Sequence, residues 1–357
     1  MAKKEILFIV QYPEHTSPSQ RFRFELYKEV LANNDYNVTI WPFFNKQEHS
    51  IIYKEGFFLF KVVAFIKGYC RRTIQLFKLN KFYTILILRE AAPIGPPIFE
   101  WLYIKLLKKK VVYDFDDAIW IPKISENNKI AELFKNGNRV KKICKWAHKV
   151  SCGNEYLCNY AKQYNKNVIF NPTCVDAENK HNQFANHDVK RVTIGWTGSF
   201  STLIYFEAII PVLEKLQLKY SFDVKIICNK KPSFKLTNLQ YIEWSEENEV
   251  SELATCQIGV MPLTNDEWSE GKSGFKLIQY LALKIPAVSS PVGVNKKIIE
   301  HGINGYLCNT QEEWYQKIEL LLLDIDLRKQ MGEVGRKKIV ANYSLQSNTK
   351  NFLQLIQ

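Results

Sequence analysis

The sequence lacks the patterns by which cysteine and histidine usually form disulfide frameworks or metal sites. Its eight cysteines are scattered, no two of them form a C-x-x-C pair, and the six histidines include no H-E-x-x-H. Several cysteines lie inside apolar runs, which is typical of reduced, buried thiols in a cytoplasmic protein. The sequence therefore disfavours a secreted disulfide scaffold and a zinc site built from histidine and cysteine.

Long hydrophobic runs are also missing. No stretch reaches the ~18 consecutive apolar residues of a membrane-spanning helix, and the apolar run before Gln11 is too short for a signal peptide. The 357 residues leave room for two domains with separate cores. With 46% hydrophobic and 24% charged residues, the composition is that of an ordinary globular protein.

Apolar strand-like segments alternate with amphipathic helical segments along most of the chain. Strands are expected at residues 6–10, 38–41, 85–88, 111–113, 149–151, 168–170, 191–196, 224–228, 239–242, 258–263 and 286–290. Helices are expected between them at residues 21–31, 98–107, 129–146 and 205–216. This alternation predicts an α/β protein with parallel sheets covered by helices. No G-x-G-x-x-G is present, which disfavours a dinucleotide-dependent dehydrogenase.

A polar stretch at residues 176–190 predicts a linker between two domains. We therefore expect a first Rossmann-like domain at residues 1–180 and a second at 190–342. Residues 343–357 are expected to form a helix that either crosses back to the first domain or caps the second.

The segment after the strand at 258–263 carries the clearest chemical signal. A short loop leads into an amphipathic helix that begins at Phe275 and contains Lys276, and the loop residues are Gly271, Lys272, Ser273 and Gly274. Glycine allows the backbone to approach a ligand, and helix N-terminal N–H groups point at negative oxygen. The segment therefore predicts the diphosphate end of a nucleotide-sugar site. A P-loop would need glycine where Asp266 stands.

Several segments together resemble glycosyltransferase family 4. They are GWTGS (195–199), IGVMPL, GKSGFKLIQYLALKIPAVSSPVGVN and HGINGYL in the second half, and SPSQRFRFEL, LREAAPIGPPIFE, VVYDFDDAIW and GNEYLCNYAKQYN in the first. The resemblance covers nearly the whole chain. It implies the GT-B fold, in which two Rossmann-like domains face a central cleft, the second binding the donor and the first the acceptor.

The resemblance also implies a reaction. A sugar would pass from a UDP-, GDP- or ADP-sugar to a glycan or lipid-linked acceptor, with retention at the anomeric carbon and without a metal or other cofactor. Lys272 and Lys276 would stabilise the departing diphosphate, and catalysis would rest on positioning and charge stabilisation. Surface-polysaccharide or glycoconjugate synthesis is the expected process.

The sequence departs from the family pattern at three positions. The family's pair of glutamates falls on Gly271, beside Glu270, and on Gln279. Gln279 can still donate and accept hydrogen bonds at the ribose hydroxyls of the donor. The position of the family's pocket histidine matches Asp116, which we expect to face the catalytic cleft.

The carboxylates around Asp116 allow a second interpretation. Asp114-Phe-Asp116 matches the DxD pattern of metal-dependent GT-A glycosyltransferases, where carboxylates hold a divalent cation that bridges the diphosphate. This alternative places the site in the first half of the chain. Asp114 and Asp117 can also be structural, through helix capping or pairing with Arg89.

Other candidate site residues directly follow expected strands or begin an expected helix. Gly198 and Ser199 follow the strand at 191–196, where they either line the diphosphate or form a tight turn. Arg21, Arg23 and Glu90 are candidates for contact with the acceptor or the diphosphate.

The formal charge of +13 raises the question of an anionic partner. Residues 57–81 and 101–110 combine apolar and basic side chains, which indicates either core helices with a basic outer face or contact with the anionic inner face of the cytoplasmic membrane. A nucleic-acid-binding protein is the alternative, but the basic residues are dispersed and no recognition motif is present, so no nucleic-acid partner is expected.

Overall fold

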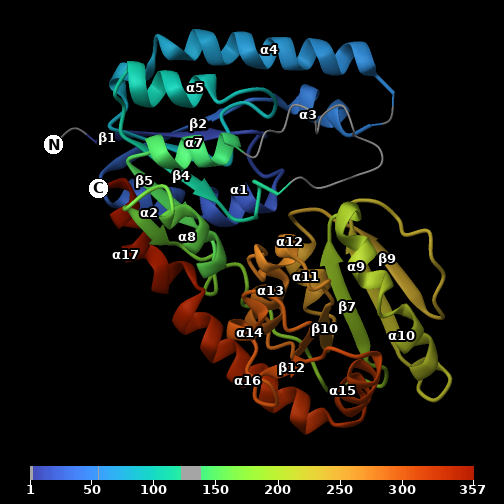
Figure 1. The fold of residues 1–357 in the computed structure, drawn as a ribbon. Helices are drawn as coiled ribbons and strands as arrows, with labels where there is room; N and C mark the ends of the chain where they lie inside the picture. Colours follow the sequence, from blue (N-terminus) through green and yellow to red (C-terminus); the bar gives the residue numbers. More distant parts are fainter. Residues whose placement is uncertain (1–2, 55, 122–137) are drawn as a thin grey trace. The chain divides into compact units, whose positions relative to one another are not determined.

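The computed structural model describes residues 3–54, 56–121 and 138–357. The chain divides into two compact units (Figure 1). Unit 1 comprises Met1–Thr173 together with Asn348–Gln357, and unit 2 comprises Cys174–Ser347. Part of the helix expected at 129–146 lies outside the described residues, and its described part is α7 (Asn138–Trp146).

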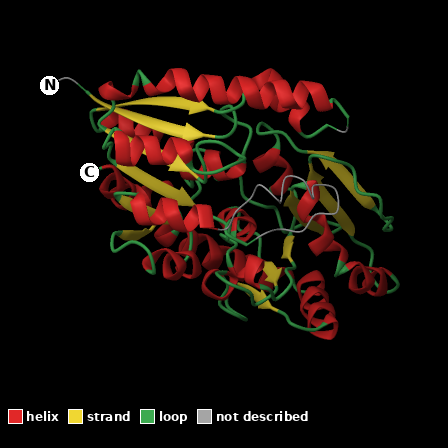
Figure 2. Cartoon of the chain, turned by 45° about the horizontal axis from the view of Figure 1, so that its top comes forward, coloured by secondary structure: helices red, strands yellow, loops and turns green. Residues whose placement is uncertain are grey.

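Unit 1 contains a six-stranded parallel sheet in the order β2-β1-β3-β4-β5-β6. Its strands coincide with the six expected from the first half of the chain: β1 (Lys4–Val10), β2 (Tyr36–Pro42), β3 (Thr84–Leu88), β4 (Val111–Phe115), β5 (Lys149–Cys152) and β6 (Val168–Phe170). The central strands β3 and β4 are buried at every position, as expected where helices cover both faces of a parallel sheet (Figure 2). The prediction of a parallel α/β fold is thereby confirmed for this unit.

The helices of unit 1 are shorter and more broken than the sequence suggests. Residues 21–31 form three elements because the backbone leaves helical geometry at Phe24, and residues 98–107 continue from an α-helix into a π-helix. The elements are α1 (Pro18–Arg23), η1 (Glu25–Tyr27), α2 (Lys28–Asn33), α3 (Lys46–Ile52), α4 (Phe58–Leu76), η2 (Leu79–Lys81), α5 (Ile98–Trp101), η3 (Leu102–Leu106) and α8 (Glu155–Lys162).

The last helix, α17 (Leu345–Ile356), packs on unit 1 through its final residues. The ring of Phe352 stacks on Tyr27 with centroids 3.8 Å apart, and Thr84 Oγ1 donates to the Ile356 carbonyl at 3.1 Å. Phe352, Leu355 and Ile356 are fully buried. Residues distant in sequence by most of the chain therefore share one core.

Unit 2 contains a second six-stranded parallel sheet, in the order β12-β11-β10-β7-β8-β9. Five of its strands match the expected ones: β7 (Thr193–Gly198), β8 (Asp223–Cys228), β9 (Leu239–Glu243), β10 (Ile258–Met261) and β11 (Ala287–Ser289). The edge strand β12 (Gly305–Leu307) was not predicted, because three residues beside a turn give no periodic signal.

The helices of unit 2 surround this sheet. The helix expected at 205–216 is interrupted before Pro211, which occupies the first turn of the second piece, where its missing N–H costs nothing. The elements are η4 (Phe200–Thr202), α9 (Leu203–Glu207), α10 (Ile210–Gln217), α11 (Glu249–Leu253), α12 (Glu267–Glu270), α13 (Phe275–Ala282), α14 (Asn295–Ile298), α15 (Gln311–Leu323) and α16 (Ile325–Asn342).

Residues 176–190, expected to be a linker, are instead a packed part of unit 2. His181 and His187 are 1% and 5% exposed. Arg336 donates to the His181 carbonyl at 2.6 Å, and the His187 Nε2 lies 2.9 Å from the Lys284 carbonyl. The segment therefore runs along unit 2, to which its two buried histidines fix it, while most of its other residues are exposed.

The buried His187 should make unit 2 sensitive to acid. Burial lowers its pKa and Arg328 acts in the same direction, although the hydrogen bond to Lys284 opposes them. The unfolded histidine takes up a proton near ~6.5, where the folded one resists it, so stability is complete above that pH and falls below it. The His187→Gln amide can still donate to the Lys284 carbonyl. We expect the melting temperature of this variant to fall less than that of the wild type between about pH 7 and 5.5.

The matched control is His15→Gln, because the His15 side chain is 65% exposed. That variant should keep the full acid sensitivity of the wild type. Identical melting curves for His187→Gln and wild type at both pH values would contradict the prediction.

In the described part of the chain, none of the helices combines the length and the apolar character that crossing a membrane requires.

Candidate functional site

The strand order of unit 2 reverses between β7 and β10, which are neighbours in the sheet. In an open parallel sheet the loops at such a point diverge to opposite faces, and ligands bind outside the carboxyl ends of the strands there. The loop after β7 begins at Gly198 and Ser199, and the segment after β10 contains residues 271–274. The fold therefore brings the two predicted donor-binding segments to one edge of the sheet.

The α13 helix is fixed against both strands. The Tyr280 hydroxyl accepts from the Thr197 N–H at 3.2 Å and donates to the Val260 carbonyl at 3.3 Å. A Cβ at Gly259 would lie 2.4 Å from the Tyr280 ring, so only glycine lets this helix pack so close to β10. The N-terminus of α13 is thus held rigidly at the carboxyl edge of the sheet.

Gly274 is the residue that starts α13. It has φ 67°, in the left-handed region, and a Cβ there would lie 2.4 Å from Ile298 Cδ1. The position therefore requires glycine both for backbone conformation and for space. Ser273 and Phe275 on either side of it are partly exposed, and Gly271 ends α12.

The two predicted lysines lie beside tryptophan rings. Lys276 Nζ is 5.3 Å from the ring centroid of Trp196 on β7, and Lys272 Nζ is 4.9 Å from that of Trp268. Both lysines are partly exposed. The Trp196 contact links α13 to the strand that ends at Gly198, so Lys276 lies between the two candidate loops.

Ser199 is exposed, and a Cβ at Gly198 would lie 2.7 Å from the Trp196 ring. The Phe200 N–H donates to Asn229 Oδ1 at 2.8 Å, which ties this loop to the end of β8. Both the tight turn and the position at the strand end that the sequence suggested are therefore present.

Gln279 is placed differently from the expectation that it reaches a ribose. Its side chain is 1% exposed, and its Nε2 donates to Glu249 Oε1 at 2.9 Å, with Glu249 3% exposed at the start of α11. The amide is used inside the protein, so direct contact with a ligand would require this pair to rearrange. No sequence signal pointed to Glu249, because the contact joins separate elements.

Asp266 shows why the segment is not a P-loop. It caps α12 by accepting from the Ser269 N–H at 2.7 Å, so the residues before Gly271 are helical. A phosphate-wrapping loop would need extended, glycine-rich backbone at this place.

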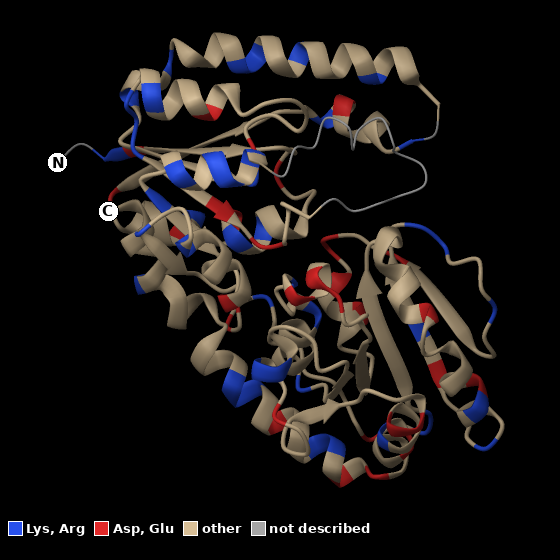
Figure 3. Cartoon of the chain, in the orientation of Figure 1, with Lys and Arg blue, Asp and Glu red and all other residues tan. Residues whose placement is uncertain are grey.

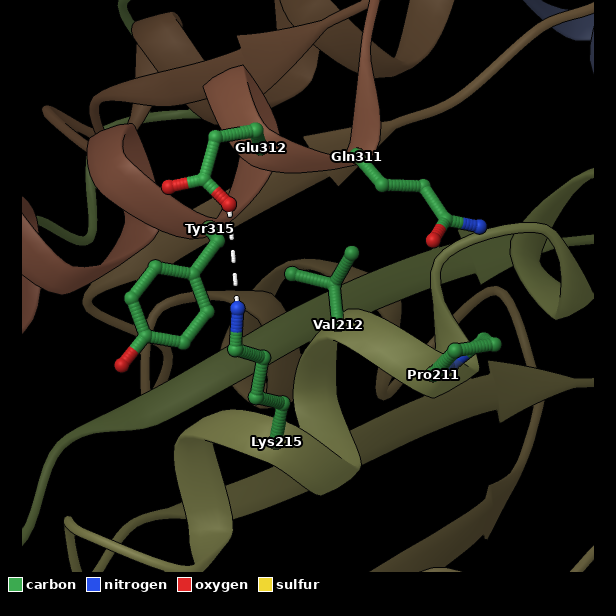
Figure 4. Close-up of a pocket in the computed structure, with 6 residues that line it drawn as sticks. All are labelled: Pro211, Val212, Lys215, Gln311, Glu312 and Tyr315. Atoms are coloured by element: carbon green, nitrogen blue, oxygen red, sulfur yellow. Dashed lines mark ion pairs between the residues drawn. The ribbon is translucent and has the colours of Figure 1, made fainter.

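A shallow pocket lies between α10 and α15 in unit 2 (Figure 4). Across it, Lys215 Nζ pairs with Glu312 at 3.7 Å and lies 4.5 Å from the Tyr315 ring centroid. The pocket shares no residue with the loops after β7 and β10.

At the carboxyl edge of the unit 1 sheet, Arg89 gathers the predicted carboxylates. It pairs with Asp116 at 2.8 Å and with Asp117 at 2.6 Å, and it donates to Ser19 Oγ at 2.9 Å. Ser19 also donates to Asp116. Arg89 has φ 61°, a conformation that costs a non-glycine residue energy and that often marks functional positions. A small pocket beside it is lined by Gln11, Tyr12, Ser17, Ser19, Gln20, Leu88 and Arg89.

Burial alone would lower the pKa of the Arg89 guanidinium, but Asp116 and Asp117 outweigh this and raise it. Arg89 is therefore a permanent cation that holds Asp116, which is 5% exposed, at the end of β4. From the sequence, Arg89 was expected only as a structural partner of Asp114 or Asp117. Its position directly after an expected strand was the signal that could have identified it.

The structure contradicts the prediction that Arg23 contacts a ligand. It is completely buried and binds Asp114 through two hydrogen bonds, Nε to Oδ2 at 2.6 Å and NH2 to Oδ1 at 2.5 Å. It also donates to the Asn171 carbonyl at 2.8 Å. A side chain satisfied in this way inside the core cannot bind a diphosphate or an acceptor, so Arg23 is structural.

The other two residues proposed for this edge are less enclosed. Arg21 is 7% exposed, with its guanidinium 4.8 Å from the ring centroid of Phe22. Glu90 is partly exposed and accepts from Gln11 Nε2 at 2.5 Å, across the ends of β1 and β3.

The Asp114-Phe-Asp116 pattern does not present two available carboxylates. Asp114 is buried against Arg23, and Asp116 is bound by Arg89. Within residues 3–54, 56–121 and 138–357, no group of three or more His, Cys, Asp and Glu side chains is arranged to hold a metal ion. The geometry thus favours arginine partners over a cation for these carboxylates.

Comparison with known proteins agrees with this architecture. Residues 233–338 match the family model "Glycosyl transferases group 1", whereas no curated protein sequence is detectably similar. A sucrose-phosphate synthase from Thermosynechococcus elongatus is similar over 99% of this chain and 98% of its own, with TM-score 0.70 and 12% identity. A glycosyltransferase from Rickettsia africae ESF-5 is similar over 100% and 98%, with TM-score 0.71 and 14% identity.

Anabaena Alr3699/HepE, solved in complex with UDP-glucose, is similar over 98% of both chains, with TM-score 0.69 and 11% identity. Identities this low establish the fold rather than the substrate. The chain therefore has the GT-B fold, and residues 233–338 of its second unit are similar to the group 1 glycosyltransferases.

Proposed function

We propose that this chain transfers a sugar from a nucleotide-diphosphosugar to a hydroxyl group of a glycan or lipid-linked acceptor, with retention and without a metal. The observation that carries the proposal is the glycine-rich segment at residues 271–274, which places Lys272, Lys276 and the N-terminus of α13 at the point where the unit 2 sheet reverses its strand order. The complexes of Alr3699/HepE with UDP-glucose and with UDP support a nucleotide-sugar donor.

In this proposal the diphosphate binds across the loops after β7 and β10. Backbone N–H groups at the start of α13 and near Gly198 donate to its oxygens, and Lys272 and Lys276 balance the charge that grows as the bond to the anomeric carbon breaks. Rings beside the two lysines restrict their motion, so less ordering is needed when the diphosphate departs.

Retention requires the acceptor oxygen to attack from the side on which the diphosphate leaves. The acceptor proton then passes to the departing phosphate oxygen while the new bond to the anomeric carbon forms. In unit 1, Asp116 accepts a hydrogen bond from the acceptor and is held in place by Arg89. Arg21 and Glu90 remain candidates for acceptor contact.

Calorimetry with UDP, GDP and ADP, each in EDTA, tests the donor site. We expect one nucleotide to bind without a metal, and Lys276→Ala to weaken it about 10- to 100-fold, because a charge-assisted hydrogen bond contributes roughly 1.5–3 kcal/mol. Lys337→Ala, which removes an exposed lysine of α16, is the matched control and should bind normally.

Binding that requires Mn²⁺ and is lost in Asp116→Asn would move the donor to unit 1 and contradict the proposal. With a donor identified, the anomeric configuration of the product, read by proton NMR, tests retention directly.

A further inference from the structure

The α4 helix exposes apolar side chains where a surface helix normally carries polar ones. Its outward stripe, here called the α4 face, follows helical spacing. The residues and their exposed fractions are Leu59 75%, Val62 39%, Val63 46%, Ile66 57%, Ile74 60% and Phe77 86%. At the start of the helix Phe57, Phe58 and Phe60 are 53%, 74% and 64% exposed. An apolar surface of this extent marks an interaction site.

The orientation of α4 is fixed by its opposite side. A Cβ at Gly68 would lie 2.4 Å from the Phe43 ring, which shows how closely the helix approaches the core. Arg72 is fully buried and donates to the carbonyls of Val10 and Ala91, both at 2.8 Å. Because these contacts hold the inner side, the α4 face cannot turn inward to bury itself.

The surroundings of the α4 face are basic. No acidic residue occurs between Gly56 and Arg89, and Lys67 and Lys78 are exposed. Figure 3 shows α4 with basic positions and no acidic ones.

The neighbouring α5 and η3 continue this character. They adjoin α4 through Tyr69 and Phe99, whose ring centroids are 5.9 Å apart. Trp101 and Leu106 are 44% and 61% exposed, and Lys105 is exposed between them. Exposed apolar and basic side chains thus occur both on α4 and on the adjoining segment formed by α5 and η3.

We propose that the α4 face, together with Trp101 and Leu106, docks unit 1 onto an anionic lipid bilayer. The apolar side chains enter the boundary between headgroups and acyl chains, and Lys67, Lys78 and Lys105 contact lipid phosphates. The positive charge around the α4 face favours an anionic bilayer over a second copy of the chain. Pairing two copies through the α4 face would bring lysines against lysines with no acidic side chain on α4 to balance them. The cluster of exposed phenylalanines at the start of the helix is also suited to insertion between the lipid acyl chains.

Co-sedimentation of the full chain with vesicles tests the proposal. We expect binding to phosphatidylglycerol vesicles, weaker binding to pure phosphatidylcholine, and a decrease with added salt. Ile66→Glu with Phe77→Glu should reduce vesicle binding about tenfold or more, because two charges enter the apolar boundary. Lys67→Glu with Lys78→Glu should reduce it by a similar factor, at about fivefold for each lysine lost.

Leu218→Glu is the control for an exposed apolar residue in unit 2, since Leu218 is 87% exposed, and it should bind vesicles normally. Nucleotide binding should be unchanged in every one of these variants, so this test is separate from that of the donor site. Absence of binding to phosphatidylglycerol at low salt would overturn the proposal. Equal loss in Leu218→Glu, or self-association of the wild type that Ile66→Glu with Phe77→Glu abolishes without any vesicle binding, would also overturn it.

Discussion

Replacing Arg23 by methionine is expected to reduce the free energy of unfolding of unit 1 by about 3–5 kcal/mol. Arg23 and Asp114 are both completely buried and joined by two hydrogen bonds. Methionine fills much of the space but leaves the Asp114 carboxylate charged, with Ser151 as a remaining donor. An isolated charge in the core costs far more than the ion pair contributes. Urea unfolding followed by circular dichroism measures the loss.

The matched control is Lys28→Met, which removes an ion pair of similar length at the surface. Lys28 Nζ lies 2.5 Å from Glu14 Oε1, and the two side chains are 43% and 37% exposed. Its cost should stay below about 1 kcal/mol. If Arg23→Met is too unstable to purify, Arg23→Lys can be measured instead. It keeps the positive charge but not the bidentate pair of hydrogen bonds, so its free energy of unfolding should fall by less. Similar values for Arg23→Met and Lys28→Met would refute the structural role of the pair.

Gln279→Glu is expected to destabilise unit 2 by about 3 kcal/mol at neutral pH. The substitution introduces the residue type typical of glycosyltransferase family 4, yet it would set a second carboxylate at the 2.9 Å contact with Glu249. Both side chains are almost completely buried, so two adjacent negative charges cannot both persist. The loss should shrink as the pH falls, because one carboxylate then takes up a proton. Thermal unfolding at several pH values measures both effects.

The double variant Gln279→Glu with Glu249→Gln restores one amide and one carboxylate in exchanged positions. We expect it to recover most of the stability, which gives a coupling free energy between the two sites. If it is no more stable than Gln279→Glu alone, the two side chains do not interact as the structure shows. Nucleotide binding by the double variant then reports whether a carboxylate at position 279 changes donor affinity.

The sheets could be predicted from sequence because their strands are short, continuous apolar runs bounded by turn residues. All of β1 to β11 coincide with expected segments, whereas β12 was missed for lack of length. Helix boundaries were less predictable. Pro211 and the irregular backbone at Phe24 divide helices that apolar periodicity alone joins. The segment 176–190 was expected to be a linker because it is polar, and its composition does not show that His181 and His187 fix it to unit 2.

The residues of the candidate site were likewise only partly predictable from the sequence. The loop residues from Gly271 to Gly274 were recognisable because glycine and lysine beside a strand and a helix are a local pattern. Contacts between distant residues were not. Arg23 looks like a surface arginine until β4 brings Asp114 to it, and Gln279 looks like a ligand contact until α11 brings Glu249. A residue type shows what chemistry is available, but only the tertiary partner shows whether that chemistry is already used.

The place of α17 has a consequence for synthesis of the chain on the ribosome. Tyr27 is translated before unit 2, but its stacking partner Phe352 is translated only after it. Until residues 348–357 leave the exit tunnel, the nascent first unit exposes the apolar surface that they cover. All residues of unit 2, Cys174–Ser347, are translated before this segment. Unit 1 is thus begun before unit 2 and completed after it.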